Sequence, residues 1–531
     1  MNALSGTGTL VRLALRRDRV LLPVWIAVFV LVAVTSAAAT KGLFPTVDSV
    51  VQAASVMNGT PALVAVYGRI YDPTSLGALA MLKALGTGAV IVGILSIVLV
   101  VRHTRAEEDA GRLELVGSGV VGRWAPLTAA LAVVVGADIV LGLLTAVAVA
   151  ASGLPVAGSM VFGLAWTSVG IAFACIAAVA VQLVRTARAA IGLSMALLGV
   201  VFLLRAAGDT ADVAGPRWLS WLSPLGWGQQ FRPYAGNRWW VLVITLVFAA
   251  VLTAVAYLLV SRRDHGAGVF PERLGPATAA PSLRGPLSLA WRLHRGALLG
   301  WTIGFVTYGL MVGSVAGSIG SMMGSAESQE MLLKLGGRDV LTDAVFAAMF
   351  GLLAVIASAY GVQTSMRLHA EEVAGRADPV LATTVSRARW AMSHAWIALA
   401  GTALLLVSAG FAAGVMHAVQ TGDAGQVGRV LSGALVQVPA AWVLTGVVVA
   451  LFGVASRLAA TGWAVLVTFL LFGDLGSLLE LDQWLMDFSP FAHVPRMPGG
   501  TVTAAPLVWL VVVAAALTAA GLTALRRRDV G

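Results

Sequence analysis

The chain has 531 residues, of which 59% are hydrophobic and only 11% are charged, with a mean hydropathy of +0.89. This composition excludes a water-soluble globular domain, which cannot cover so much apolar surface, and it predicts an integral membrane protein. The net charge of +10 could indicate a nucleic-acid-binding protein. Arginines placed in cytoplasmic loops beside anionic lipid explain the same excess, and we favour that interpretation.

A short basic segment opens the chain. Arg12, Arg16 and Arg19 share one face of a helix, which is typical of a helix lying in the headgroup plane with its arginines reaching lipid phosphates. A charged flank that only fixes the topology explains the same residues, and both interpretations stay open. The apolar run that follows is too long for a cleavable signal peptide.

Twelve apolar segments then follow along the chain, each close to the roughly 20 residues that a membrane-spanning helix needs. Their high content of Gly and Ala favours close packing of helices in lipid. We predict an all-α membrane protein with transmembrane helices at residues 21–40, 78–101, 125–151, 158–184, 189–206, 239–260, 298–320, 343–365, 391–418, 430–454, 459–477 and 505–525.

The distribution of basic residues predicts the orientation. Most of the 35 lysines and arginines fall in the loops on one side of these helices, together with both chain ends. Basic residues concentrate on the cytoplasmic side of membrane proteins. We therefore predict that both termini lie in the cytoplasm.

An acidic motif follows the second predicted helix and returns after the eighth. The first acidic motif, residues 107–114, reads EEDAGRLE, and the second, residues 371–378, reads EEVAGRAD. Residues 13–25, 218–224 and 262–264 also return, at 289–301, 484–490 and 527–529. These matches predict two parallel six-helix halves, residues 1–264 and 289–531, related as a pseudo-dimer and joined by a cytoplasmic linker at 265–288.

The spacing within each acidic motif predicts a helix that carries an ion pair. Glu108 and Arg112 are four residues apart in the favourable order, as are Glu372 and Arg376. A basic-aromatic pair follows each motif, at residues 123–124 and 389–390. The segment between the motif and this pair is two residues longer in the second copy. A solvated helix would explain the charges without a function. We favour a docking surface, because a solvated face does not require the same residue order twice.

Two further features of these motifs concern the helix ends. Thr104 and Glu107 are spaced as a capping box at the start of the first motif. Gly111 and Gly375 either weaken the helix or permit a close backbone approach.

The last outer loop of each half contains Ser-Pro, at Ser223-Pro224 and Ser489-Pro490, where we predict breaks between short helices. Tryptophans of the first of these loops predict an interfacial aromatic belt. They are Trp218, Trp221, Trp227, Trp239 and Trp240.

No catalytic, metal-ligating or P-loop pattern is found in the sequence. A P-loop needs Gly-Lys-Ser/Thr, and Gly precedes none of the lysines, Lys41, Lys83 and Lys334. His103 and His369 flank the acidic motifs, and we predict that they form hydrogen bonds there.

Lys83 and Asp138 are ionisable residues inside predicted membrane helices, and such residues are functional candidates. Both lie deep in their helices, so an ion pair between them is geometrically possible. A polar patch in a translocation path is one interpretation, and a buried structural pair is the other.

The acidic motif after the second helix, the six-helix unit and the terminal Arg-Arg-Asp together resemble the type-2 ABC exporter permeases. The fused twelve-helix form is similar to the membrane subunits of polyketide-antibiotic and multidrug exporters of bacterial cell membranes. The resemblance implies that the segments at about 103–118 and 367–385 are coupling helices, each seated in a separate ATPase subunit that binds ATP and Mg²⁺. The residues implied in this contact are Glu107, Glu108, Gly111, Arg112, Glu371, Glu372, Gly375 and Arg376.

The resemblance implies a transport subunit without enzymatic activity, which exports hydrophobic or amphiphilic small molecules such as antibiotics and drugs. A proton-coupled multidrug transporter with Asp138 as proton carrier is an alternative, as is a permease that exports lipids or glycolipids. A membrane scaffold or a lipid-modifying enzyme is a further alternative, although the repeated motifs and the missing catalytic pattern speak against it. In the second motif, Asp378 and Pro379 depart from the first copy, which predicts unequal ATPase contacts.

Overall fold

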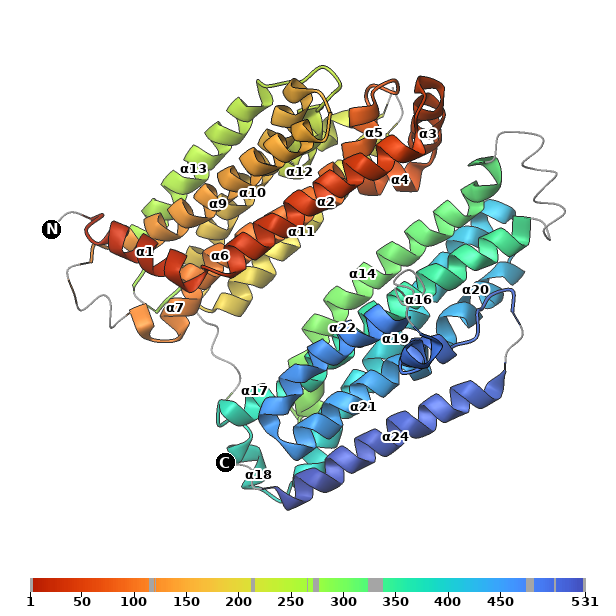
Figure 1. Cartoon of the computed structure of the whole chain (residues 1–531). Coiled ribbons are helices and arrows are strands. Elements are labelled where there is room, and N and C mark those ends of the chain that lie inside the picture. Colours follow the sequence, from red (N-terminus) through yellow and green to blue (C-terminus); the bar gives the residue numbers. More distant parts are fainter. Residues whose placement is uncertain are drawn as a thin grey trace. The chain divides into compact units, whose positions relative to one another are not determined.

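The computed structural model describes residues 3–113, 119, 121–211, 215–264, 266–270, 277–322, 338–473, 482–500 and 503–528. The regular secondary structure of these residues is entirely helical, which confirms the predicted all-α fold (Figure 1). The chain divides into two compact units, residues 1–275 and 276–531, and the division falls within the predicted linker.

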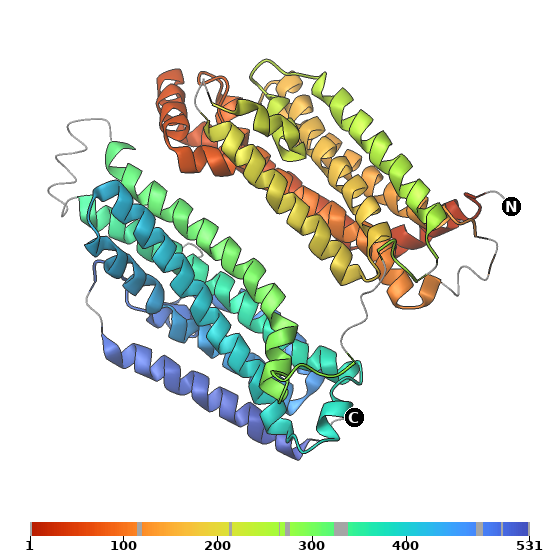
Figure 2. The ribbon, with the colours of Figure 1, turned by 180° about the vertical axis from the view of Figure 1, so that it is seen from behind.

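Unit 1 is a bundle of long apolar helices with short helices at both ends. Its elements are α1 (Thr7–Arg17), α2 (Leu21–Leu43), α3 (Val47–Gly59), α4 (Pro61–Tyr67), α5 (Leu76–Lys83), η1 (Ala84–Gly88), α6 (Ala89–His103), α7 (Arg105–Asp109), α9 (Ala125–Ala151), α10 (Val156–Leu183), α11 (Ala187–Thr210), η2 (Arg217–Leu222), α12 (Pro224–Gln230) and α13 (Val241–Arg262). Figure 1 shows α1 and α7 at one end of this bundle and α3 and α4 at the other, and Figure 2 shows the same arrangement from behind.

All six long helices predicted in the first half are present in unit 1. The second of them is one continuous helix, because the π-helical turn η1 joins α5 to α6. The Trp166 indole donates a hydrogen bond of 3.1 Å to the carbonyl of Ala84 in this turn. The short helices α3 and α4 were not predicted.

Helix α10 lies at the centre of unit 1, because nearly all of its residues are buried against α6, α9, α11 and α13. Glycines permit the closest of these approaches. A Cβ atom on Gly163 of α10 would lie 2.2 Å from the carbonyl oxygen of Gly142 on α9. Close packing through small residues, predicted from the composition, therefore determines the centre of the bundle.

Unit 2 is a second helical bundle. Its elements are α14 (Pro286–Met322), α16 (Arg338–Ser365), α17 (Arg367–Val373), α18 (Asp378–Leu381), α19 (Arg387–Thr421), α20 (Gly425–Leu435), α21 (Val438–Val454), η3 (Ser456–Thr461), α22 (Gly462–Gly473), α23 (Gln483–Met486), η4 (Pro490–His493) and α24 (Ala504–Arg527). Figure 1 shows α17, α18 and the end of α24 at one end of the bundle.

Eleven helices in the described residues are long and apolar enough to cross a membrane. The eleventh predicted helix, 459–477, is the exception. It corresponds to a shorter apolar helix, Ser456–Phe472, and its last predicted residues lie outside the described residues. A multi-pass membrane protein is thus confirmed, while the full count of twelve membrane helices stays a prediction.

The predicted basic helix is a separate helix only in unit 1. There α1 ends at Arg17 and α2 begins at Leu21, whereas the matching segment of unit 2 is the first part of the 37-residue helix α14. Asp18, between α1 and α2, is fully buried and contacts His103 at 2.6 Å and Arg102 at 2.9 Å. This carboxylate fixes α1 to the end of α6.

Both Ser-Pro pairs separate short helices, as predicted. Ser223 ends η2, and its hydroxyl accepts a hydrogen bond of 3.3 Å from the Gly226 amide at the start of α12. Ser489 precedes η4 and donates a hydrogen bond of 3.0 Å to the carbonyl of Phe469. The belt prediction is wrong for Trp227, which is buried and donates a hydrogen bond of 2.6 Å to the Trp221 carbonyl.

Candidate functional site

The first acidic motif begins where the second membrane helix ends. Helix α6 stops at His103, and α7 starts two residues later at Arg105. The predicted capping box is wrong, because the Thr104 hydroxyl donates a hydrogen bond of 2.7 Å back to the Val100 carbonyl and caps nothing. Its short side chain satisfies the last turn of α6 instead of the first turn of α7.

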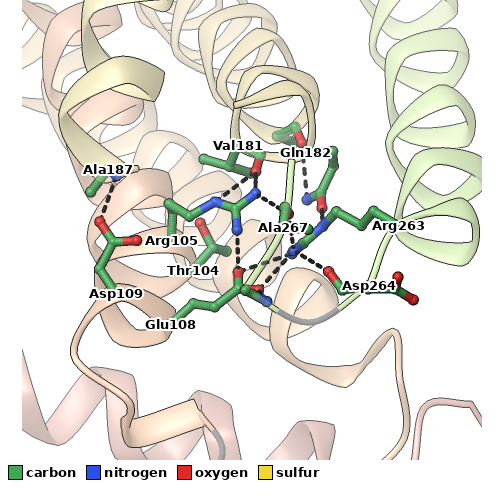
Figure 3. Close-up of polar contacts among 12 residues, drawn as sticks. Thr104, Arg105, Glu108, Asp109, Val181, Gln182, Ala187, Arg263, Asp264 and Ala267 are labelled. Carbon is green, nitrogen blue, oxygen red and sulfur yellow. Dashed lines mark hydrogen bonds and ion pairs between the residues drawn. The ribbon is translucent and has the colours of Figure 1, made fainter. Parts of the chain in front are cut away.

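Buried Arg105 holds α7 against the bundle. Its guanidinium donates hydrogen bonds of 3.0 and 2.6 Å to the carbonyl of Val181, near the end of α10, and one of 3.1 Å to that of Ala267 (Figure 3). The same group donates a hydrogen bond of 2.8 Å to Glu108. Charge-assisted bonds of this kind are strong, so they hold the start of α7 against the end of α10.

Glu108 is the centre of the network in Figure 3. Arg263, directly after α13, donates to both of its carboxylate oxygens, at 2.7 and 3.0 Å, and the Gly266 amide adds a bond of 2.7 Å. Only 7% of the Glu108 side chain is exposed. Glu108 therefore joins α7 to the chain that follows α13, and it is not available as a surface charge.

Glu107 pairs with Arg112 at 2.7 and 2.9 Å, and also with Arg17 at the end of α1. Gly111 reverses the chain between Glu107 and Arg112, with a φ of +68° that L-residues rarely adopt. The predicted pair of Glu108 with Arg112 is wrong for this reason. The chain reversal after α7 brings the Arg112 side chain back to Glu107, five residues earlier.

Asp109 ends α7 and reaches the start of the next helix. Its carboxylate accepts a hydrogen bond of 2.7 Å from the amide of Ala187, the first residue of α11 (Figure 3). An acidic group at this position satisfies a free amide of the first turn and opposes the positive end of the helix dipole. The segment α7 is thus bonded to α10, to α11 and to the end of α13.

The second acidic motif repeats this geometry within unit 2. Arg376 donates to Glu371 at 2.8 and 3.4 Å, across Gly375 with a φ of +63°. Arg528, at the end of α24, donates to both oxygens of Glu372, at 2.8 and 2.7 Å. The predicted pair of Glu372 with Arg376 is therefore wrong, for the same reason as in the first motif.

Two contacts show how the second copy is anchored. Arg367 takes part in the Glu371 pair at 2.9 Å, and Arg528 also donates a hydrogen bond of 3.0 Å to the Phe452 carbonyl near the end of α21. The helix α17 is therefore bonded to α21 and α24.

His103 and His369 both form hydrogen bonds, as predicted. His369 bonds with the Ser456 hydroxyl at 2.6 Å.

The segment after the glycine turn is fully described only in the second copy. Residues 114–118, including Glu114, lie outside the described residues, whereas Asp378 and Pro379 open the short helix α18. The first predicted coupling segment, 103–118, is thus described only in part.

The structure does not bring Lys83 and Asp138 together. Asp138 of α9 is fully buried and accepts hydrogen bonds of 3.1 and 3.2 Å from the Ser96 hydroxyl of α6. The Lys83 ammonium lies 6.0 Å from the centre of the Tyr67 ring. No ion pair joins the two residues in the part of the chain that the structure describes, so the suggested pair is not formed.

Comparison with known proteins identifies the family. The family described as "Multidrug efflux system permease Rv1217c, C-terminal domain" matches residues 8–259 and 283–526, one range within each unit. The chain belongs to this family of multidrug efflux permeases. The multidrug efflux system permease protein Rv1217c of Mycobacterium tuberculosis is 45% identical to it over 529 residues, which cover 99% of this chain and 95% of that protein.

The glutamates of each acidic motif contribute little to its exposed surface. Both glutamates of each motif are turned toward arginines, and the exposed residues are Asp109, Ala110 and Arg112 in the first motif and 373–376 and 378 in the second. Arg112 and Arg376 are the exposed basic residues among these, with 53% and 56% of their side chains exposed.

Sequence reasoning missed the residues that anchor the motifs. Arg105 resembles any basic residue that flanks a membrane helix, so no pattern distinguishes it before its burial is known. The repeat of Arg263 at Arg528 was a usable signal, because both follow the last helix of a half at the same position. Their pairing with Glu108 and Glu372 explains why this repeat exists.

Proposed function

We propose that the chain is the membrane subunit of an ATP-driven ABC exporter that moves hydrophobic or amphiphilic small molecules, including antibiotics and drugs, out of the cytoplasm. Two copies of a separate ATPase, which hold ATP and Mg²⁺, contact the two acidic motifs. Both termini and both motifs lie in the cytoplasm, at the inner membrane of a bacterial cell. The observation that carries the proposal is the repeated bonding of each motif to the end of the last helix of its unit, at Glu108–Arg263 and Glu372–Arg528.

These bonds connect each acidic motif to membrane helices, so they can transmit the movement that ATP hydrolysis drives in the ATPase. When an ATPase displaces α7, the hydrogen bonds of Arg105 and Asp109 and the ion pair of Glu108 transmit that displacement to the ends of α10, α11 and α13. In unit 2, α17 transmits it to α21 and α24 through Arg528. A docking surface that is rigidly tied to membrane helices couples motion well, because its displacement is not absorbed by a flexible loop.

The residues that would touch the ATPase are those of the glycine turns, with Arg112 and Arg376 as the main charges. The glutamates act as positioning residues that hold these turns. This assignment changes the role implied by family resemblance, in which the glutamates themselves dock. Exposed arginines suit an acidic cleft on the partner, with charge complementarity that favours rapid association.

The test is reconstitution of the permease with the candidate ATPase. We expect the two proteins to co-purify with two ATPase subunits per permease, and substrate to stimulate ATP hydrolysis. Arg112→Glu combined with Arg376→Glu should reduce this stimulation by tenfold or more, since it reverses both docking charges. Arg12→Glu with Arg292→Glu is the matched control, because these exposed arginines lie outside the motifs.

Two outcomes would contradict ATP-driven transport. One is a permease that purifies alone and shows no ATP hydrolysis when the ATPase is added. The other is transport by the chain alone, driven by a proton gradient and abolished by an uncoupler, which would favour a proton-coupled transporter. Export of labelled lipids, but not of drugs, by the reconstituted pair would favour a lipid-exporting permease instead.

A further inference from the structure

The chain between the second acidic motif and Trp390 contains an arginine, Arg389, that has no counterpart in the first copy. Arg123 in unit 1 donates a hydrogen bond of 2.6 Å to the Arg263 carbonyl. In unit 2 the same bond, of 2.6 Å to the Arg528 carbonyl, comes from Arg387 and not from Arg389. The two additional residues of this segment, Ala388 and Arg389, therefore come after the bonded arginine, and they belong to the first turn of α19.

Arg389 lines a pocket of about 590 Å³ between the starts of α14 and α19. Arg284, two residues before α14, lines the same pocket, and its remaining lining contains no acidic residue. Neither guanidinium has a hydrogen bond or an ion pair among the described residues of the chain. Two uncompensated positive charges thus face one pocket.

Apart from three serines, the rest of the pocket lining is uncharged and apolar, and the pocket is open to the surroundings. Leu287, Met392 and Trp396 line it, with exposed fractions of 48%, 39% and 58%. Arg389, Met392 and Trp396 are spaced by three and four residues, so they share one face of α19. Trp396 lies two turns from Arg389, which corresponds to about 10 Å along the helix axis. Positive charge therefore gives way to apolar surface along this face.

We propose that this pocket binds one anionic phospholipid, with its phosphate between Arg284 and Arg389 and an acyl chain along Met392 and Trp396. Arginine pairs hold phosphate oxygens through several hydrogen bonds, and exposed tryptophans suit the boundary between headgroups and hydrocarbon. The proposal does not depend on the proposed transport function. The proposal applies to unit 2, because unit 1 has no counterpart of Arg389: its Arg123 corresponds to Arg387 and is bonded to the Val260 and Arg263 carbonyls.

The test uses the full-length permease in nanodiscs and follows quenching of tryptophan fluorescence by lipids with brominated acyl chains. The chain has 16 tryptophans, so the signal of Trp396 is taken as the difference between the wild type and Trp396→Phe. We expect brominated phosphatidylglycerol to quench Trp396 at a lower mole fraction than brominated phosphatidylcholine. Each arginine near a phosphate contributes about fivefold in affinity, so Arg284→Gln with Arg389→Gln should remove about 25-fold of this preference.

Arg292→Gln with Arg295→Gln is the matched control, since both arginines belong to α14 but do not line the pocket. Equal quenching of Trp396 by the two lipids in the wild type would overturn the proposal, as would a preference that the pocket variant keeps. Loss of the preference on addition of inorganic phosphate would assign the site to free anions instead of lipid, and would overturn it too. If the pocket variant does not insert into the membrane, native mass spectrometry of the wild type tests the site instead. Retention of phosphatidylglycerol that is no stronger than retention of phosphatidylcholine would contradict the site.

Discussion

Glu108 and Arg263 are 155 residues apart in the chain and form a two-bond ion pair that joins α7 to the end of α13. Glu372 and Arg528, 156 residues apart, form the corresponding pair in unit 2. A contact over such a distance in sequence closes each unit at the end where its acidic motif lies. It also makes the motif sensitive to the position of the last membrane helix of its own unit.

A double-mutant cycle should detect this pair. Because both side chains are mostly buried, we expect Glu108→Ala and Arg263→Ala each to destabilise the permease, and the double variant to lose less than their sum. The coupling free energy should be about 1–3 kcal/mol. Thermal unfolding in detergent measures it, and strictly additive effects of the two substitutions would contradict the pair.

The glycine turn gives a second prediction. Gly111→Ala forces a side chain into the left-handed region, at a cost of about 1–2 kcal/mol, although no atom lies within 4 Å of the added Cβ. Gly136→Ala is the control, because its Cβ also meets nothing within 4 Å and its helical backbone suits alanine. We expect lower thermal stability for the first variant only, together with weaker stimulation of ATP hydrolysis.

A third prediction concerns the centre of unit 1. The Cβ of Gly163→Ala would collide with the backbone of α9, so we expect a loss of about 1–3 kcal/mol or a shift of α10. Gly199→Ala on α11, where nothing lies within 4 Å, should be neutral or stabilising. Equal unfolding temperatures for the two variants would show that the helices do not approach as closely as described.

Asp138→Asn distinguishes the two modes of energy supply. An asparagine oxygen can still accept the hydrogen bond from the Ser96 hydroxyl, so the fold should be kept. For an ATP-driven exporter we expect drug transport to stay within about twofold of the wild type, a change below 0.5 kcal/mol. Transport assays in vesicles with and without an uncoupler make the measurement, and abolished transport would support a proton-carrying Asp138.

The sequence was sufficient for the long helices, because a run of about 20 apolar residues is a strong signal in a membrane protein. It failed for α3, whose Thr46 cap and mixed face resemble a polar loop. For the predicted helix 459–477, hydropathy did not reveal that its first residues belong to the 3-10 helix η3 before α22 begins at Gly462. Those features depend on caps and packing that a hydropathy pattern does not contain.

The repeat of the two motifs was evident from the sequence, but the contacts of their residues were not predicted. Helical spacing suggested Glu108 with Arg112, because an uninterrupted helix was assumed. Gly111 at positive φ ends that helix, and the arginine turns back to Glu107. The partner of Glu108 comes from the far end of the unit, and only the repeat of Arg263 at Arg528 pointed to it.

The π-helical turn at Ala84–Gly88 has a consequence for comparisons among relatives of this permease. A π turn contains one residue more than an α turn, so each side chain beyond it is offset by about 100° from where an uninterrupted α-helix would place it. A relative without that extra residue would keep both helix faces in place by closing the turn to α geometry. A one-residue gap in this part of the second membrane helix would therefore record the loss of the turn, while the packing of α6 on α10 stays the same.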